Sequence, residues 1–99
     1  MAFKINWAPA ALNDYMQVLT YLTSTWEKGS ANSFVDKVDK KASSVSSNPG
    51  IGRMCGQEPN VRRFVITSHN LLYYKANQET IEIVAVFDTR QNPSKNRFG

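Results

Sequence analysis

The chain has 99 residues, of which 41% are hydrophobic, and a formal net charge of +4; this length is typical of a single domain with one modest core. Its one cysteine, Cys55, excludes an internal disulfide and a thiolate metal cluster. No apolar run approaches the ~20 residues needed to span a bilayer, and the first residues lack the basic and apolar regions of a signal peptide, so we expect one cytoplasmic domain over residues 1–99 with no membrane partner.

The first segment predicts a strand followed by a helix. Phe3, Ile5 and Trp7 alternate with polar residues, which is the period of a half-buried strand. Pro9 then suits the first turn of a helix, and Gly29 suits the C-terminal cap of that helix. The apolar residues that form a stripe along this helix are Leu12, Tyr15, Leu19, Leu22 and Trp26.

A second helix is predicted from Ser30, which can cap its N-terminus, to the stop signal Asn48-Pro49-Gly50. Its apolar stripe consists of Phe34, Val35, Val38, Ala42 and Val45. Its opposite side carries Asp36, Lys37, Asp39, Lys40 and Lys41, a pattern typical of a solvated face. Because the connection between the two helices is short, we expect an antiparallel hairpin.

The second half of the chain predicts a loop and three strands. Residues 48–60 contain three glycines and two prolines and are expected to be loop. Strands are predicted over Val61–Thr67, Leu71–Ala76 and Thr80–Phe87, joined by polar turns into an antiparallel meander. The last strand is apolar on both faces from Val84 onward, as in the middle of a sheet. The order β-α-α-β-β-β predicts an α+β fold in which the N-terminal helical hairpin packs on one face of an antiparallel sheet.

The candidate functional residues are mostly basic. Residues 53–99 contain seven Lys and Arg against four Asp and Glu, and all five arginines are among them. Guanidinium groups suit bidentate recognition of phosphate or carboxylate, which favours nucleic acid or an acidic protein surface as the partner. Tyr73 and Tyr74 are adjacent in a strand, so one faces the core and the other the opposite side. The outward one is a candidate contact, and packing of both is the alternative.

Five stretches in this order resemble the RelE/ParE superfamily of bacterial toxins from type II toxin–antitoxin systems: FKINWAPAALND, NPGIGR, VRRFVI, LLYYK and IEIVAVFDTRQNP. The NPGIGR and FDTRQNP segments are closer to the ParE-like side of the superfamily. The resemblance implies a small cytoplasmic toxin, neutralised by a cognate antitoxin protein whose extended or helical tail covers the basic sheet. Contact with operator DNA is then expected only through the antitoxin.

The resemblance also implies two kinds of target, because RelE-type members cut mRNA in the ribosome and ParE-type members inhibit DNA gyrase. Metal-free RNA cleavage needs a base, an acid and a cation for the phosphorane oxygens. Arg90 follows the last strand, where the nucleases of the family keep an active-site arginine, and His69 is the only histidine, a side chain that suits proton transfer. Glu58 is a further candidate base. The tail QNPSKNRFG, however, lacks the tyrosine or histidine that these nucleases commonly place there.

We therefore expect a ParE-like toxin that inhibits a protein target, namely DNA gyrase. The residues expected to bind the target or the antitoxin are Arg53, Arg62, Arg63, Tyr74, Arg90, Lys95 and Arg97. The alternative is a metal-independent, ribosome-dependent mRNA endoribonuclease with Arg63, Arg90, His69 and Tyr74 in its active site. A second alternative is a degenerate toxin that acts only as an antitoxin partner or corepressor. No spacing of ligand residues resembles a metal site, no cofactor is expected, and Asp88 is expected to pair with Arg90 or a backbone group.

Overall fold

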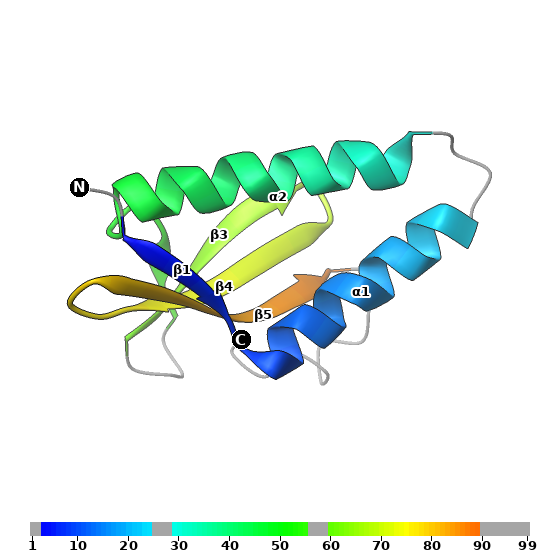
Figure 1. Ribbon diagram of the computed structural model, residues 1–99. Coiled ribbons are helices and arrows are strands. Elements are labelled where there is room, and N and C mark those ends of the chain that lie inside the picture. Colours follow the sequence, from blue (N-terminus) through cyan, green and yellow to red (C-terminus); the bar gives the residue numbers. More distant parts are fainter. Residues whose placement is uncertain (1–2, 25–28, 56–59, 90–99) are drawn as a thin grey trace.

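A helical hairpin covers one face of a five-stranded sheet in the computed structural model (Figure 1), which describes residues 3–24, 29–55 and 60–89. The elements in chain order are β1 (Lys4–Trp7), α1 (Pro9–Ser24), α2 (Ser30–Ser47), β2 (Arg53–Met54), β3 (Val61–Thr67), β4 (Asn70–Ala76) and β5 (Thr80–Asp88). This order confirms the predicted α+β class and the helical hairpin. In the described parts of the chain, no helix is both long and apolar enough to cross a membrane.

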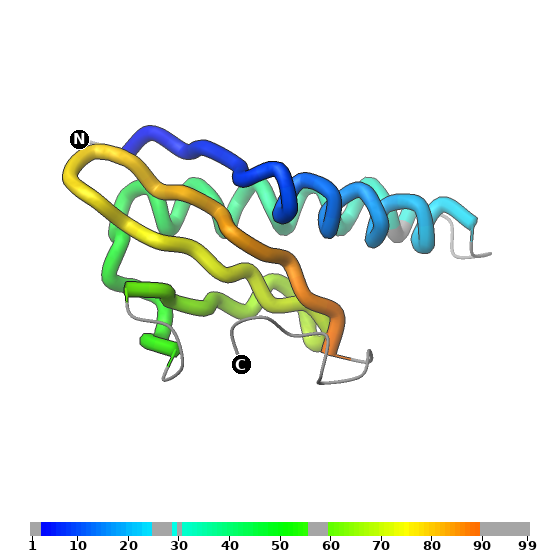
Figure 2. Tube along the Cα trace, turned by 90° about the horizontal axis from the view of Figure 1, so that it is seen from below, coloured from blue at the N-terminus to red at the C-terminus, as the bar shows by residue number. Residues whose placement is uncertain are grey.

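The sheet is mixed, whereas the sequence predicted an antiparallel one. Its strand order is β1-β5-β4-β3-β2, which can be followed in Figure 2, the view from below Figure 1. Strand β1 runs parallel to β5, with Lys4 opposite Thr80 and Trp7 opposite Ile83, and the remaining pairs are antiparallel. A parallel pair needs a long crossover connection, and here the two helices lie within the chain between the paired strands.

A short strand also interrupts the segment predicted to be loop. Residues 48–60 were expected to contain no regular structure, but Arg53 and Met54 form β2 and pair with Arg63 and Arg62 of β3. Two residues are too few to produce a periodic pattern in the sequence. The strand therefore exists because β3 offers an edge, which is a tertiary effect.

The main core lies between the helices and the sheet. Phe34, Val38 and Val45 of α2 are buried there, as their spacing predicted. The sheet contributes Ile66, Leu72, Tyr74, Ile81, Ile83 and Val86. Complete burial of an aliphatic side chain of this kind stabilises the fold by about 1.5–3 kcal/mol. Ring contacts connect Trp7 to Tyr15 at 5.1 Å and Tyr15 to Phe34 at 5.7 Å, so β1, α1 and α2 pack together at this end of the core.

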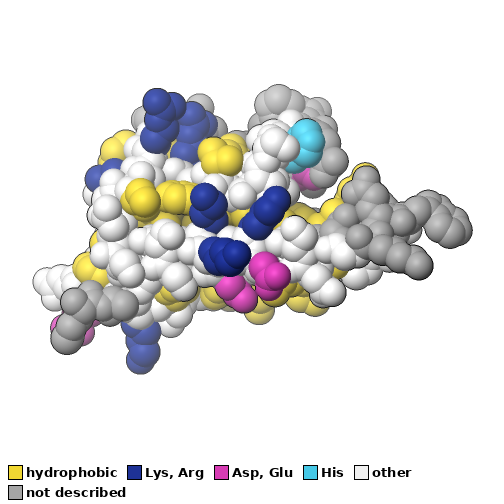
Figure 3. Space-filling view, turned by 90° about the horizontal axis from the view of Figure 1, so that it is seen from above, with side chains coloured by type: hydrophobic (Ala, Val, Ile, Leu, Met, Phe, Trp, Pro, Cys, Tyr) yellow, Lys and Arg dark blue, Asp and Glu magenta, His cyan; other side chains and the backbone are white. Residues whose placement is uncertain are grey.

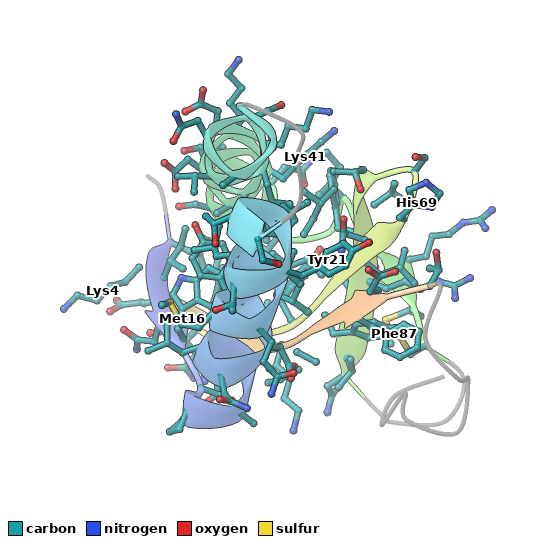
Figure 4. The ribbon with its side chains drawn as sticks, turned by 90° about the vertical axis from the view of Figure 1, so that its right-hand side faces the viewer. Lys4, Met16, Tyr21, Lys41, His69 and Phe87 are labelled. Carbon is teal, nitrogen blue, oxygen red and sulfur yellow. The ribbon has the colours of Figure 1, made fainter. Side chains whose placement is uncertain are left out.

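A second, smaller cluster lies on the face away from the helices. It contains Cys55, Val61, Tyr73, Val84 and Ala85, with Leu71 and Phe87 packed against it. A β-bulge produces part of it: Tyr73 pairs with Ala85 while Tyr74 pairs with Ile83, so Val84 is the extra residue. Figure 4 shows Phe87 on the side of β5 away from α1. The prediction that β5 is apolar on both faces is confirmed.

Two details of the helices differ from the sequence prediction. Leu12 was placed on the buried stripe of α1, yet it is 48% exposed, and the neighbouring Ala11 is buried in its place. The other described members of the stripe, Tyr15, Leu19 and Leu22, pack against the core as predicted. Gly29 was predicted to end the first helix and Ser30 to cap the second. Gly29 is instead the N-cap of α2, in a left-handed conformation (φ 81°) that glycine adopts without strain, and no side chain caps the helix. The predicted stripe residue Trp26 lies outside the described residues.

Helix α1 also supports the middle of the sheet. Strand β1 ends at Trp7, opposite Ile83, so the rest of β5 has no described strand on that side. There the Val86 N–H donates a hydrogen bond to the Asp14 carboxylate at 3.1 Å. A helix side chain thus takes over the role of the missing strand at this position, because a buried backbone N–H needs an acceptor.

Candidate partner-binding groove at the edge of the sheet

The loop between α2 and β2 is held on the sheet by Tyr74 of β4. The Tyr74 hydroxyl donates a hydrogen bond to the Pro49 carbonyl at 2.8 Å and accepts one from the Gly52 N–H at 2.9 Å. Burial raises the pKa of this hydroxyl, and the Gly52 hydrogen bond and the Arg62 charge oppose that rise only partly. Tyr74 is therefore a neutral, two-way hydrogen-bonding group at physiological pH.

Arg62 of β3 holds the same loop from a second position. Its Nη1 donates hydrogen bonds to the Gly52 carbonyl at 2.7 Å and to the Gly50 carbonyl at 3.5 Å. Arg62 was predicted to bind a partner, but the structure engages its guanidinium with the protein's own backbone. We refer to the two side chains, Tyr74 and Arg62, as the loop clasp.

Both tyrosines pack inside the protein, which is one of the two interpretations that the sequence allowed. Tyr73 and Tyr74 do point to opposite faces, since Tyr74 belongs to the main core and Tyr73 to the smaller cluster. Both are nevertheless 0% exposed. Period-2 alternation places a side chain on a face but does not report whether that face is covered. Here the 49–52 loop bonds to Tyr74, and the smaller cluster surrounds Tyr73.

The clasp positions a groove of about 470 Å³ at the edge of β3. Arg53 of β2 lies opposite Arg63 of β3, and Lys41 of α2 lies over the Phe64 ring with its Nζ 5.1 Å from the ring centroid. The groove is lined by Lys41, Ile51, Arg53, Arg63, Phe64, Val65 and Leu71. Seen from the helix side, Lys and Arg side chains form groups with hydrophobic side chains between them (Figure 3). The groove therefore combines positive charge with apolar surface.

Two members of the groove are large hydrophobic side chains with unusual exposure. Ile51 is 45% exposed and Val65 is 57% exposed. An isolated apolar side chain on a surface needs no explanation, but these two line the same groove as three cations. Arginine is enriched at protein–protein interfaces, so two arginines beside exposed aliphatic side chains make this groove a candidate protein-binding site.

The structure does not bring His69 to this groove. His69 follows β3 and Arg63 lies near its start, and at about 3.3 Å per residue the strand from Arg63 to Thr67 is roughly 13 Å long. The His69 carbonyl accepts hydrogen bonds from the Thr89 N–H at 2.8 Å and the Thr89 hydroxyl at 3.3 Å. Arg63 therefore lies near the start of β3, whereas His69 lies just after its end. His69 is also beside the end of β5.

Several residues predicted from the sequence lie outside the described residues. These are Glu58, Arg90, Lys95 and Arg97, together with any pairing of Asp88 with Arg90. Of the predicted binding residues, the structure brings together Arg53 and Arg63. In the described ranges, no group of three His, Cys, Asp or Glu side chains could hold a metal ion. Burial raises the pKa of the Cys55 thiol, with a smaller opposing effect of Arg63, so this thiol stays protonated.

Sequence reasoning missed Lys41, Ile51, Val65 and Leu71. Lys41 was assigned to the solvated face of α2 with its neighbours, but its contact with the Phe64 ring and its place in the groove lining distinguish it from them. Val65 was expected to be an ordinary strand residue. No local pattern separates these positions from similar ones, because membership of the groove depends on which residues the packing of α2 and β2 leaves beside the edge of β3.

Comparisons with known proteins agree with this architecture. The family described as "ParE toxin of type II toxin-antitoxin system, parDE" matches residues 5–93. Toxin ParE1 of Mycobacterium tuberculosis (strains CDC 1551 / Oshkosh and ATCC 25618 / H37Rv) is 26% identical over 97 residues, which cover 97% of this chain and 99% of that protein.

Solved structures share the fold at low sequence identity. A chain of the chromosomal ParDE toxin–antitoxin system from P. aeruginosa superposes with a TM-score of 0.72 at 16% identity, covering 88% of this chain and 96% of that one. The YoeB dimer from Staphylococcus aureus gives 0.66 at 18% identity, with coverage of 88% and 97%. The E. coli RelE toxin gives 0.63 at 14% identity, with coverage of 94% and 90%. The family match over residues 5–93 shows that the chain belongs to the ParE toxin family of type II toxin–antitoxin systems.

Proposed function

We propose that this toxin acts by binding a protein target, DNA gyrase, and that a cognate antitoxin neutralises it by covering the same basic groove. The observation that carries the proposal is the lining of the groove. Among the described residues it contains two arginines, a lysine and four apolar side chains, with no His, Tyr, Asp or Glu. Arginine cannot shuttle protons because it stays protonated, and Lys41 is the one described lining side chain of a type that can. The described lining therefore offers no acid–base pair, which supports recognition.

The test is inhibition of gyrase supercoiling by purified toxin. Wild-type toxin is expected to block supercoiling, and Arg53→Glu, which reverses one groove charge, is expected to weaken inhibition by about tenfold or more. Lys4→Glu is the matched control, because it makes the same charge change on β1 at the opposite edge of the sheet. Figure 4 shows Lys4 on the far side of the molecule from His69. Unimpaired supercoiling at saturating wild-type toxin would exclude gyrase as the target.

A second candidate function, ribosome-dependent mRNA cleavage, has one observation in its favour. The hydrogen bonds that Thr89 donates to the His69 carbonyl place the histidine beside the end of β5, and Arg90 is the next residue along the chain. Transcript mapping after induction tests it, with His69→Ala as the variant. Intact mRNA during growth arrest would remove this candidate, and cleavage lost in His69→Ala would favour it over gyrase inhibition. Growth arrest without antitoxin would also exclude a degenerate toxin that serves only as a corepressor.

A further inference from the structure

The outer face of α1 is uncharged along its whole length. None of the exposed residues of this fully described helix is charged. Asp14 is its one charged residue, and that carboxylate is half-buried and accepts the Val86 N–H. The exposed face of α2, by contrast, carries Asp36, Lys37 and Lys40. Because solvated helix faces normally carry charged and polar side chains, α1 has the composition of a face that another surface covers.

The serine and threonine hydroxyls on this face are already bonded within the helix. The Thr20 hydroxyl donates to the Met16 carbonyl at 2.9 Å, and the Thr23 hydroxyl donates to the Thr20 carbonyl at 3.0 Å. The Ser24 hydroxyl donates to the Tyr21 carbonyl at 2.8 Å. A polar group is costly to bury when it lacks a hydrogen bond. Another molecule can therefore cover these hydroxyls at little cost.

Two large apolar side chains lie on the same face. Leu12 is 48% exposed and Met16 is 52% exposed. They are four residues apart, and Thr20 follows after another four, so the three side chains form a row on the helix surface. We refer to Leu12, Met16 and Thr20 as the α1 row. Figure 4 shows Met16 on the side of α1 toward Lys4 of β1. Rows with this spacing form the ridges that pack against another helix.

We propose that the α1 row packs against the α1 row of a second copy of the chain, so that two molecules form a symmetric dimer through this helix. In such a dimer each copy contributes the same patch, and the patch must not repel itself. The chain has a formal net charge of +4. Two copies that met through the groove would bring Lys41, Arg53 and Arg63 toward the same cations of the other copy. The uncharged face of α1 avoids this repulsion.

Two amide side chains on this face suit contact with an identical surface. Asn13 and Gln17 are exposed and lie beside the α1 row. Each side-chain amide contains both hydrogen-bond donors and an acceptor, whereas a carboxylate only accepts and an ammonium group only donates. An amide can therefore bond to the same amide of a second copy. The polar part of this face is thus self-complementary.

The absence of charge disfavours two other occupants. A nucleic acid gains affinity when cations neutralise its phosphates, and the sequence of α1 contains no Lys or Arg. A strongly charged protein surface would lose hydration against this face without gaining an opposite charge. A second copy of the same face meets neither obstacle.

The dimer is expected to be weak and to leave the groove accessible. α1 has 16 residues, so it is about 24 Å long, and one helix face of this length covers less than the roughly 800 Å² per partner of a stable complex. Figure 2 shows α1 following β1 on one side of the sheet, whereas β2, which supplies Arg53 to the groove, is the strand at the opposite edge. Self-association through α1 therefore does not depend on what the groove binds.

Sedimentation equilibrium of the purified full chain, from micromolar to millimolar concentration, measures the association. The wild type is expected to shift from monomer to dimer over this range. Met16→Glu is expected to raise the dissociation constant by about tenfold or more, because it places two carboxylates in the uncharged contact. Ser43→Glu is the matched control: it adds the same charge at an exposed position of α2 and is expected to leave the dissociation constant nearly unchanged. Circular dichroism checks that both variants fold as the wild type does.

Amide chemical shifts then locate the contact. In spectra recorded at rising concentration, the signals of Met16 and Thr20 should shift, whereas the signal of Lys40, on the exposed face of α2, should stay constant. If the chain dimerises but the shifts map to Val65 and its neighbours in the groove, and Met16→Glu associates like Ser43→Glu, the contact lies at the groove and the proposal is wrong.

Two further results would contradict the dimer. A wild type that stays monomeric at millimolar concentration would exclude self-association through α1. A monomeric wild type in which the protein encoded by the adjoining reading frame shifts the Met16 and Thr20 signals would assign the α1 row to that protein. Because none of these measurements involves gyrase or mRNA, such results would leave the proposed function to its own test.

Discussion

Gly52 and Tyr74 are in such close contact that a side chain at position 52 would force a neighbour to move. The Gly52 N–H donates a hydrogen bond to the Tyr74 hydroxyl at 2.9 Å, and a Cβ on Gly52 would lie 2.7 Å from that oxygen and 2.9 Å from the Arg63 carbonyl. One of these neighbours is backbone and cannot rotate away. The approach of the loop to the sheet therefore requires glycine, and the position of the whole groove depends on it.

Gly52→Ala should displace the loop and destabilise the protein. Overpacking of this kind costs about 1–3 kcal/mol, and the free energy of unfolding from urea denaturation measures it. Gly50→Ala is the control in the same loop, because a Cβ there would have its nearest neighbour, the Asn48 side chain, at 3.8 Å. Equal stability losses in the two variants would show that the contact between Gly52 and Tyr74 does not hold the loop.

Tyr74→Phe should destabilise the protein without changing the shape of the core. The ring remains, but the Pro49 carbonyl and the Gly52 N–H both lose their partner, and a buried unsatisfied group costs about 1–3 kcal/mol. Tyr21→Phe, at a tyrosine that is 53% exposed, should change stability much less. We also expect weaker partner binding in Tyr74→Phe, since Ile51 and Arg53 follow the loop. If Tyr74→Phe is destabilised but binds the partner with wild-type affinity, the loop clasp does not control binding at the groove.

The same hydroxyl predicts a dependence of stability on alkaline pH. Burial raises the Tyr74 pKa in the folded state above its unfolded value, so the folded protein holds this proton more tightly. The associated stability is fully present below the ordinary tyrosine pKa of about 10 and is lost as the pH rises through the folded-state value. Unfolding free energies measured from pH 8 upward should fall more steeply for the wild type than for Tyr74→Phe. Burial also raises the Tyr15 pKa, so the variant should still lose some stability at alkaline pH. If the unfolding free energies of the wild type and Tyr74→Phe fall in parallel with pH, the assignment to Tyr74 is wrong.

Asp14→Ala should weaken the junction between α1 and β5. The carboxylate accepts the Val86 N–H at 3.1 Å, and hydrogen bonds to charged groups contribute about 1.5–3 kcal/mol. Asp36→Ala, at an exposed position of α2, removes the same charge without this contact and should cost much less. Thermal unfolding of the two variants measures the difference. Asp14→Asn keeps an acceptor oxygen and should recover part of the lost stability. If Asp14→Asn is as unstable as Asp14→Ala, the charge of Asp14, and not its hydrogen bond, accounts for the loss.

Much of the fold follows from local periodicity. Alternation of apolar residues predicted β1, and the three-to-four-residue spacing of Phe34, Val38 and Val45 predicted the buried face of α2. These predictions succeeded because a side chain's direction within a helix or strand depends only on position in the repeat. The burial predicted for Leu12 was wrong. The helical repeat predicts which residues form a stripe, but not how much of that stripe the neighbouring sheet covers.

For the groove, the sequence predicted the residue types involved but not where tertiary packing would place them. The chain by itself determined that Arg62 and Arg63 would lie on the first strand of the meander, whereas Arg53, predicted to lie in a loop, joins the sheet only through β2. Tertiary packing decided the rest. It engaged Arg62 with the loop, buried Tyr74 beneath it and turned Lys41 toward Phe64. Sequence patterns report the direction of each side chain along its own element, whereas the groove at Val65 exists because the Tyr74 hydroxyl draws a distant loop off the edge of β3.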